Sequence, residues 1–375
     1  MVRSSPRRRL AWISALSIGA ASAIILVISA RPGTVVGPYT RASRSGGVSR
    51  RAESPAMASF KQGDDSLQAY RLRAAEVAFR RALDLDPKLT VARWKLVSIY
   101  TMQMRRAELL AEFEALAGLA PLTFDQAYMW SQIRCSIWEP QRVTPALSRF
   151  LEADPGDRWV RLALAEGLRQ MGRLDESEEV LAPLALSDPD ARVVRARLAL
   201  DRGDEPAARA MLAEGPADHA GLARLRGRMA LARHDWPAAI SEFRAALAAE
   251  PDHRDGLLGL ARAHRLAGND SEAGPLQDAV ARHDTLLNLL NRAARSPTER
   301  DDPRFLREVG AACETLGLVP EARVWYGLAI ARDPTIPEAQ AALYRIGMSG
   351  PRTRPGRPGK ASLRSPPPAK EPPAR

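Results

Sequence analysis

A proline recurs at a fixed interval through most of the chain, and this period constrains the fold more than any other feature. Four of these prolines are each separated by 34 residues: Pro87, Pro121, Pro155 and Pro189. The phrase that ends on such a proline also recurs, as "AEVAFRRALDLDP" (75–87), "AISEFRAALAAEP" (239–251) and "ARVWYGLAIARDP" (322–334). A period of this length indicates a stack of similar supersecondary units rather than one globular core.

The repeated phrase has the properties of a helix that packs closely on another helix. Ala239 and Ala246 lie two turns apart on one face, and Phe243 lies between them on the same face. Pro237 suits the first turn of a helix, and Pro251 ends it. Aromatic residues are only 5% of the chain, while Ala, Leu and Arg, which are strong helix formers, are abundant. The sequence therefore predicts an all-α fold.

The period and its key residues resemble the tetratricopeptide repeat family. In the best copy, 303–336, the matching residues are Gly310, Gly317, Ala322, Tyr326, Ala329 and Pro334. The resemblance covers about residues 56–347. It implies an all-α, right-handed superhelical solenoid of about eight helix-turn-helix units, with glycine in the turns, where a left-handed backbone is needed.

We divide this region into eight repeats and a terminal helix. The repeats are 56–89, 90–123, 124–157, 158–188, 189–219, 220–253, 254–287 and 303–336. The copy at 124–157 is poor, because Val143 and Leu147 replace the expected alanine and aromatic residue. The segment 336–347 is predicted to cover the last open apolar face. The insertion 286–302 is predicted to lengthen the second helix of repeat seven and add a polar loop, either as a contact or bend or as tolerated loop growth.

The N-terminal region contains an uncharged stretch, Leu10–Ala30, that follows three arginines. A helix of this length would be about 31 Å long, enough to cross the apolar core of a bilayer. It predicts a transmembrane signal anchor. A cleaved signal peptide and a buried helix of a soluble domain are the alternatives. The arginines before the span are the denser group, which favours a cytoplasmic N-terminus and a repeat region on the outer, periplasmic side of the membrane.

The remaining segments are rich in Pro, Gly, Ser and Arg. We interpret 1–9 as a basic flank, 31–55 as a flexible linker and 348–375 as a disordered tail. The tail is a candidate contact for an anionic surface, with a purely solvated tail as the alternative. The net charge of +11 comes from these flanks, so the folded region is close to neutral, and no specific nucleic-acid partner is expected.

The sequence contains no recognisable catalytic or metal-binding motif. Its five histidines are scattered, and phosphate-binding loops and nucleophile elbows are missing. The repeats also leave no room for a catalytic domain. We therefore expect no catalytic residue, no metal and no cofactor.

The resemblance implies that binding occurs on the concave surface, at positions 2, 5, 9 and 12 of each first helix. These positions give the candidate peptide-binding residues Phe60, Trp94, Tyr128, Gln132, Trp159, Arg224, Arg228, Arg262, Arg265, Arg304 and Arg307. Aromatic residues dominate the early half and arginines the later half, which predicts a peptide that is apolar at one end and acidic at the other. The alternative is that the aromatic rings pack between repeats and the arginines are ordinary surface residues.

These features predict a non-catalytic, membrane-anchored scaffold that binds other proteins or peptides at the cell envelope. An accessory subunit of an export or assembly machine, of the polysaccharide secretion or cytochrome maturation type, is the alternative. Arginine outnumbers lysine 50 to 5, which indicates a GC-rich, bacterial genome.

Overall fold

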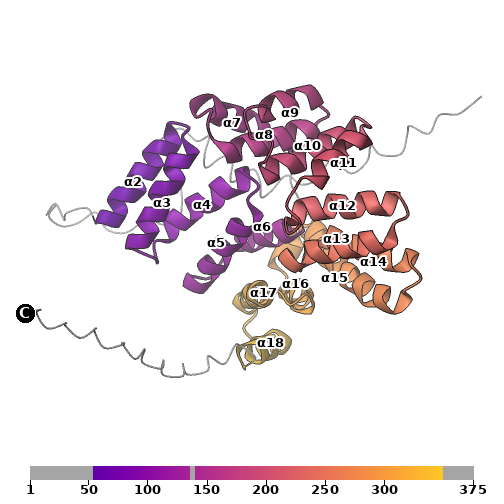
Figure 1. Cartoon of the computed structure of the whole chain (residues 1–375). Coiled ribbons are helices and arrows are strands. Elements are labelled where there is room, and N and C mark those ends of the chain that lie inside the picture. Colours follow the sequence, from indigo (N-terminus) through magenta and orange to yellow (C-terminus); the bar gives the residue numbers. More distant parts are fainter. Residues whose placement is uncertain (1–53, 136–139, 349–375) are drawn as a thin grey trace, which may run out of the picture.

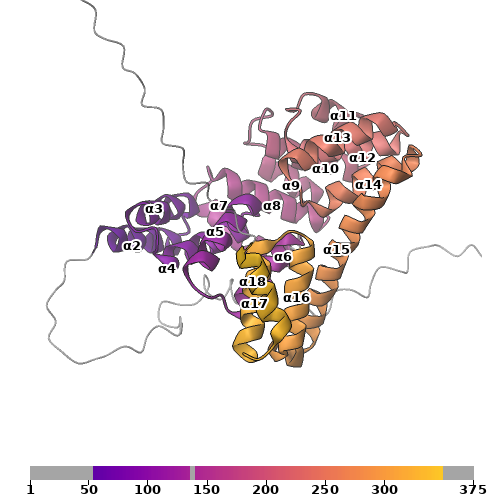
Figure 2. The same cartoon turned by 90° about the horizontal axis from the view of Figure 1, so that it is seen from below.

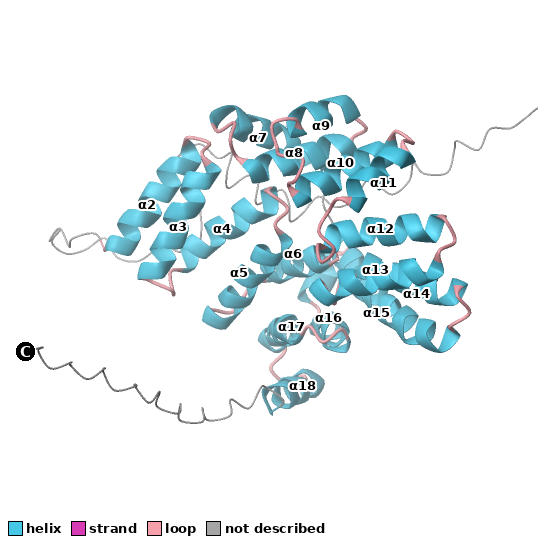
Figure 3. Ribbon diagram, viewed as in Figure 1, coloured by secondary structure: helices cyan, strands magenta, loops and turns pink. Residues whose placement is uncertain are grey.

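The computed structural model describes residues 54–135 and 140–348. Within these ranges the chain forms 17 α-helices and one short 3-10 helix, without any strand (Figure 3). The helices of the first half are α2 (Pro55–Gln68), α3 (Leu72–Leu85), α4 (Thr90–Met102), α5 (Arg106–Leu119), α6 (Phe124–Arg134), α7 (Pro140–Ala153), α8 (Arg158–Gln170) and α9 (Leu174–Leu181). Those of the second half are α10 (Pro189–Asp201), α11 (Glu205–Ala213), α12 (Ala220–Ala232), α13 (Trp236–Ala249), α14 (Arg254–Leu266), α15 (Asp270–Arg295), η1 (Pro297–Asp301), α16 (Pro303–Thr315), α17 (Val319–Arg332) and α18 (Pro337–Met348).

Most successive helices pair and stack into a curved solenoid, which confirms the predicted all-α repeat fold (Figure 1). The predicted transmembrane helix, 10–30, lies outside the described residues, as do 349–375 of the predicted tail. Among the helices that the structure does describe, none combines the length and apolar character needed to cross a membrane.

Three repeats are held together by an aromatic ring packed against glycine, namely Phe79 on Gly63, Phe243 on Gly227 and Tyr326 on Gly310. Ala239, Phe243 and Ala246 on α13 are all buried. A Cβ atom at Gly227 of α12 would lie 3.0 Å from the Phe243 ring, and one at Gly259 of α14 only 2.4 Å from it. The ring therefore fills the space left by missing side chains in its own repeat and in the next repeat.

The turn between the two helices of a repeat adopts a left-handed backbone. Gly172, Gly203, Gly268 and Gly317 have φ angles of +78°, +79°, +77° and +73°. Tyr70, Met104 and His234 occupy the equivalent place in other repeats, with φ angles of +58°, +58° and +62°. The turn geometry is thus kept even where a side chain is present, at a cost of about 1–2 kcal/mol per residue.

The insertion in repeat seven has the predicted form. The second helix, α15, is 26 residues long, and η1 follows it. Its added turns place Leu286, Leu289 and Leu290 in a core shared with α16 and α17. At the end of the solenoid, Ala339 and Ile346 of α18 join the same core, so α18 covers α17 as predicted.

Helix α6 departs from the nearest-neighbour packing of a repeat solenoid. It packs on α5, α15 and α17, and makes no comparable contact with α7, the second helix of its own repeat. Figures 1 and 2 show α6 near the centre of the arc formed by the other helices, beside α17. Trp130 on one side of α6 stacks on Phe113 of the N-terminal core, while Phe124 and Tyr128 join the C-terminal core.

Buried polar contacts hold α6 against the C-terminal helices. The Trp325 indole N–H donates to the hydroxyl of Ser131 at 3.0 Å, and both residues are fully buried. The Arg134 guanidinium lies 2.6 Å from Glu321 and 2.7 Å from Asp252. Burial raises the pKa of Glu321 despite this nearby charge. These contacts join repeat three to repeats six and eight. We call the residues that make them the clasp: Ser131, Arg134, Asp252, Glu321 and Trp325.

The ring–glycine contact makes a stability prediction in repeat eight. A Cβ atom at Gly310 would lie 2.8 Å from the Tyr326 ring, whose hydroxyl is held by Glu314. Gly310→Ala should lower the free energy of unfolding by about 1–3 kcal/mol in urea denaturation, because the ring cannot yield easily. Gly327→Ala in α17 is the matched control, since its Cβ meets nothing within 4 Å; it should be neutral or slightly stabilising. Equal effects of the two changes would contradict this account.

The clasp makes a second prediction. Arg134→Ala leaves Glu321, which is 1% exposed, without its counterion and should lower the free energy of unfolding by about 3 kcal/mol. Arg332→Ala breaks a solvated pair with Asp301 and should cost less than about 1 kcal/mol. Denaturation of both variants in urea checks the difference, and a loss for Arg134→Ala no larger than the control would show that the clasp is not structural.

Candidate functional site

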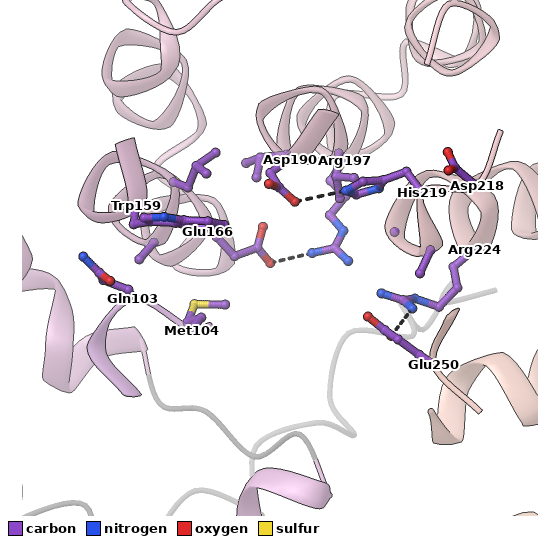
Figure 4. Close-up of a pocket in the computed structure, with 16 residues that line it drawn as sticks. Gln103, Met104, Trp159, Glu166, Asp190, Arg197, Asp218, His219, Arg224 and Glu250 are labelled. Atoms are coloured by element: carbon purple, nitrogen blue, oxygen red, sulfur yellow. Dashed lines mark hydrogen bonds and ion pairs between the residues drawn. The ribbon is translucent and has the colours of Figure 1, made fainter. Parts of the chain in front are cut away.

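A polar cavity of about 460 Å³ lies where the first helices of three consecutive repeats meet. We call it the inner cavity. It is lined by α8, α10 and the start of α12, by the turn after α4, and by the residue that follows α13 (Figure 4). The lining residues are Gln103, Met104, Trp159, Leu162, Ala163, Glu166, Asp190, Val193, Val194, Arg197, Asp218, His219, Ala220, Gly221, Arg224 and Glu250.

Side-chain caps fix where the lining helices begin. The Asp157 carboxylate accepts from the backbone N–H groups of Trp159 and Val160, each at 3.0 Å. The Asp188 carboxylate caps α10 by accepting from the N–H of Ala191. Because each first helix begins at an equivalent place, residues two, five and nine positions into the repeat face the same side.

Glu166 is the most tightly bound charge in the cavity. Arg169 donates to both carboxylate oxygens at 2.9 Å, and Arg197 donates to one of them at 3.1 Å. Burial opposes ionisation, but these bonds and charges outweigh it and hold the pKa of Glu166 below its usual value. Glu166 thus stays ionised although it is only 4% exposed.

Arg197 stands in a field of like charges. Burial lowers the pKa of Arg197, and the nearby guanidinium groups of Arg169, Arg224 and Arg228 add to this effect, while Glu166 opposes it. Its hydrogen bond to Glu166 uses one nitrogen of the guanidinium. On the side of Arg224 and Arg228, these neighbouring cations favour an anionic ligand.

A histidine and a carboxylate form the upper edge of the cavity in Figure 4. The Nδ1 atom of His219 accepts from the N–H of Leu222 at 3.3 Å, so the proton of the neutral ring sits on Nε2. That Nε2 donates to Asp190 at 3.1 Å. This hydrogen bond and the contact with Arg158 lower the pKa of Asp190.

The opposite wall carries an unused hydrogen-bond donor. The Oε1 atom of Gln103 accepts from Arg105 at 3.3 Å, which assigns the other polar atom of the amide as Nε2. Gln103 is 3% exposed, and its Nε2 has no partner among the described residues. Beside it, the Trp159 ring lies 4.8 Å from the guanidinium carbon of Arg105 and 4.4 Å from that of Arg158.

The predicted aromatic residues do not gather at one site. Phe60 packs on Phe79, with ring centroids 5.5 Å apart, and Trp94 packs edge-on against Phe113 at 5.7 Å. Tyr128 is buried in the C-terminal core, where its hydroxyl accepts from Gln132. Of the five predicted residues in the early half, Trp159 alone lines the inner cavity.

The predicted arginines lie along the later first helices. Arg224 lines the inner cavity and pairs with Glu250. Arg228 follows one turn later on α12 and is exposed, as are Arg262 and Arg265 on α14 and Arg304 on α16. Arg307 lies at a different cavity of about 640 Å³, between α16 and α18. The structure therefore places Trp159 and Arg224 in one site and distributes the other arginines beyond it.

Sequence reasoning missed most residues of the cavity, among them Glu166, Arg197 and Gln103. Glu166 and Arg197 stand at position 9 of repeats four and five, so the same positional rule could have found them. Gln103 lies in an inter-helix turn of repeat two, and no repeat position signals it. Its place in the cavity depends on how the solenoid curves.

Two segments of the chain match sequence models of the tetratricopeptide repeat, at residues 139–198 and 224–285. The chain thus contains tetratricopeptide repeats, as the sequence pattern predicted. It is also 32% identical over 142 residues to the cellulose synthase operon protein C of Xanthomonas axonopodis pv. citri (strain 306). That match covers 35% of this chain but only 9% of the relative's length.

Several solved structures match this chain at low sequence identity and low TM-score. The Cut9–Hcn1 hetero-tetramer of the APC/C is 14% identical, with a TM-score of 0.39 over 80% of this chain and 57% of that chain. Yeast Tom70 is 12% identical, with a TM-score of 0.35 over 81% of this chain and 66% of that chain. YrrB, a tetratricopeptide repeat protein with an unusual peptide-binding site, is 19% identical, with a TM-score of 0.21 over 54% and 90% of the two chains.

The low pKa of Glu166 predicts how stability depends on pH. A carboxylate whose pKa is lowered by folding stabilises the fold above pH 4.5, its ordinary value, and this contribution is lost as the pH falls through the folded-state pKa. Glu166→Gln should therefore flatten the decline in unfolding free energy below pH 4.5. It should also destabilise the chain at pH 7, because Arg197 loses its counterion.

Urea denaturation across this pH range checks the prediction. Glu214→Gln is a suitable control, since the Glu214 side chain is 75% exposed. Identical pH slopes for Glu166→Gln and the unchanged chain would show that Glu166 is not the group responsible.

Proposed function

We propose that this protein is a non-catalytic scaffold that holds a segment of a partner protein in the inner cavity. The observation that carries the proposal is a polar cavity of about 460 Å³ formed by the first helices of consecutive repeats. Its charged groups are held in place by ion pairs and helix caps, which prepares the surface for a ligand before binding.

We further propose that the scaffold is tethered to the membrane by Leu10–Ala30, with the repeats on the periplasmic side. The support is the length and uncharged character of this stretch and the arginines before it. The basic C-terminal tail would then be available to an anionic surface. A tether would keep the inner cavity close to partners in the same membrane and raise their effective concentration.

An accessory role in a polysaccharide secretion machine is the second candidate. This role is favoured by the similarity to cellulose synthase operon protein C, whose name refers to the operon of a polysaccharide synthase. Since this chain matches 9% of that relative, the similarity supports a shared repeat segment and leaves the partner to experiment.

Site-directed photo-crosslinking in whole cells tests the scaffold proposal. A photoreactive residue at Asp218, which lines the cavity and is exposed, should form an adduct with a partner protein. The same residue at Val77, which is 68% exposed on α3, should not form this adduct. Arg228→Glu should abolish the Asp218 adduct by reversing a charge near the cavity, and Arg233→Glu should leave it intact.

The outcomes distinguish binding at a specific site from nonspecific crosslinking. An adduct at both positions, or one that survives Arg228→Glu, would rule out partner capture in the inner cavity. Protease accessibility of the repeat region in intact and permeabilised cells checks the side of the membrane.

A further inference from the structure

Three arginines occupy the same repeat position on consecutive first helices. Arg197, Arg228 and Arg262 are the ninth residues of repeats five, six and seven, on α10, α12 and α14. These helices pack against one another in order. We call the three residues the arginine stripe. Glu166, the ninth residue of repeat four, ends the stripe beside Arg197 (Figure 4).

The stripe carries positive charge that the protein does not neutralise. Arg197 pairs with Glu166 and shares it with Arg169. Across residues 54–135 and 140–348, no ion pair or hydrogen bond engages the side chain of Arg228 or Arg262. Many other arginines of the solenoid are paired, for example Arg158 with Asp188 and Arg254 with Asp284. Unpaired guanidinium groups in a row suit carboxylates, which they bind with a planar pair of donors.

The spacing of the stripe selects the shape of the ligand. Packed helices lie about 8–10 Å apart, so equivalent side chains on neighbouring helices repeat at about that interval. A peptide in the polyproline II conformation rises about 3.1 Å per residue with three residues per turn, so every third side chain returns to one face after about 9 Å. The two intervals match.

We propose that the arginine stripe binds an extended acidic peptide whose carboxylates recur at every third residue. This inference rests on the proposed scaffold function and specifies its ligand. Each carboxylate meets one guanidinium, and the intervening residues face away from the stripe. The Glu166 carboxylate lies at one end of the stripe and would repel an acidic residue of the peptide at that end.

A second observation supports a peptide rather than a continuous polyanion. The wall opposite Arg224 is formed in part by the neutral side chain of Gln103 (Figure 4). The cavity is also lined by the carboxylates of Asp190, Asp218 and Glu250 in addition to Glu166. These groups would repel the closely spaced charges of a nucleic acid or an acidic polysaccharide, whereas a peptide can place neutral residues beside them.

Fluorescence anisotropy with the purified full-length chain tests the proposal. Two labelled nine-residue peptides have the same composition, with glutamate either at the first, fourth and seventh places or at the first three places. The spaced peptide should bind at least about fivefold more tightly, because the clustered one reaches fewer guanidinium groups. Arg228→Gln and Arg262→Gln should each weaken its binding about twofold to fivefold, and the double variant about tenfold.

Arg233→Gln is the matched control, because Arg233 is exposed and ends α12 away from the stripe, and it should leave the affinity unchanged. Unchanged melting temperatures for the variants show that folding is intact. Equal affinity for the two peptides, or tighter stripe-dependent binding of heparin or single-stranded DNA, would overturn the proposal. If the Asp218 adduct forms but neither peptide binds, the scaffold function stands and the proposed acidic ligand is wrong. If the Asp218 adduct does not form either, the scaffold function is also wrong.

Discussion

The contact between an aromatic ring and a glycine sets the geometry on which the solenoid depends. Phe243 lies between Gly227 and Gly259, so one side chain fixes both its own repeat and the start of the next. Because the ring occupies the space of a Cβ atom, the first helices of neighbouring repeats approach closely and keep the same orientation. Equivalent positions of stacked first helices face one side, which is why α8, α10 and α12 can share a cavity. The residues between the packing positions are left free to vary.

Repeat three departs from nearest-neighbour stacking. Its second helix has Val143 and Leu147 at the places of the alanine and the aromatic ring, and α6 packs elsewhere. Trp130 joins the N-terminal core while Phe124 joins the C-terminal core. A stack held only by nearest neighbours can flex along its length, whereas the clasp restrains repeats that are far apart in sequence. The curved solenoid brings Gln103 and Glu250 to the same cavity from repeats two and six.

Charge on the inner surface follows from the same architecture. Stacking places position 9 of each repeat next to that of its neighbour, so the order Glu166, Arg197, Arg228 and Arg262 becomes a row in space. The carboxylate neutralises the first arginine and leaves the others to solvent or to a ligand. A scaffold of this kind can change its specificity through single substitutions at exposed position-9 residues such as Arg228 and Arg262, since these contribute little to packing. The ring–glycine contacts would be unaffected by such changes.

The sequence by itself determined the repeat fold, because the packing residues recur with the period of the structure. It also predicted the lengthened α15 and the covering role of α18, since both follow from apolar residues placed at helical intervals. Trp159 and Arg224 were predicted by counting repeat positions; Arg197 was missed, although the same count gives it as position 9 of repeat five. Only the tertiary structure decided that Tyr128 is buried against α17 and that Gln103 lies beside Trp159 in the wall of a cavity. Those outcomes depend on the curvature of the whole stack and on the clasp, which are set by contacts between residues nearly 200 positions apart, such as Ser131 and Trp325. A local pattern cannot encode such a pairing, because neither residue repeats.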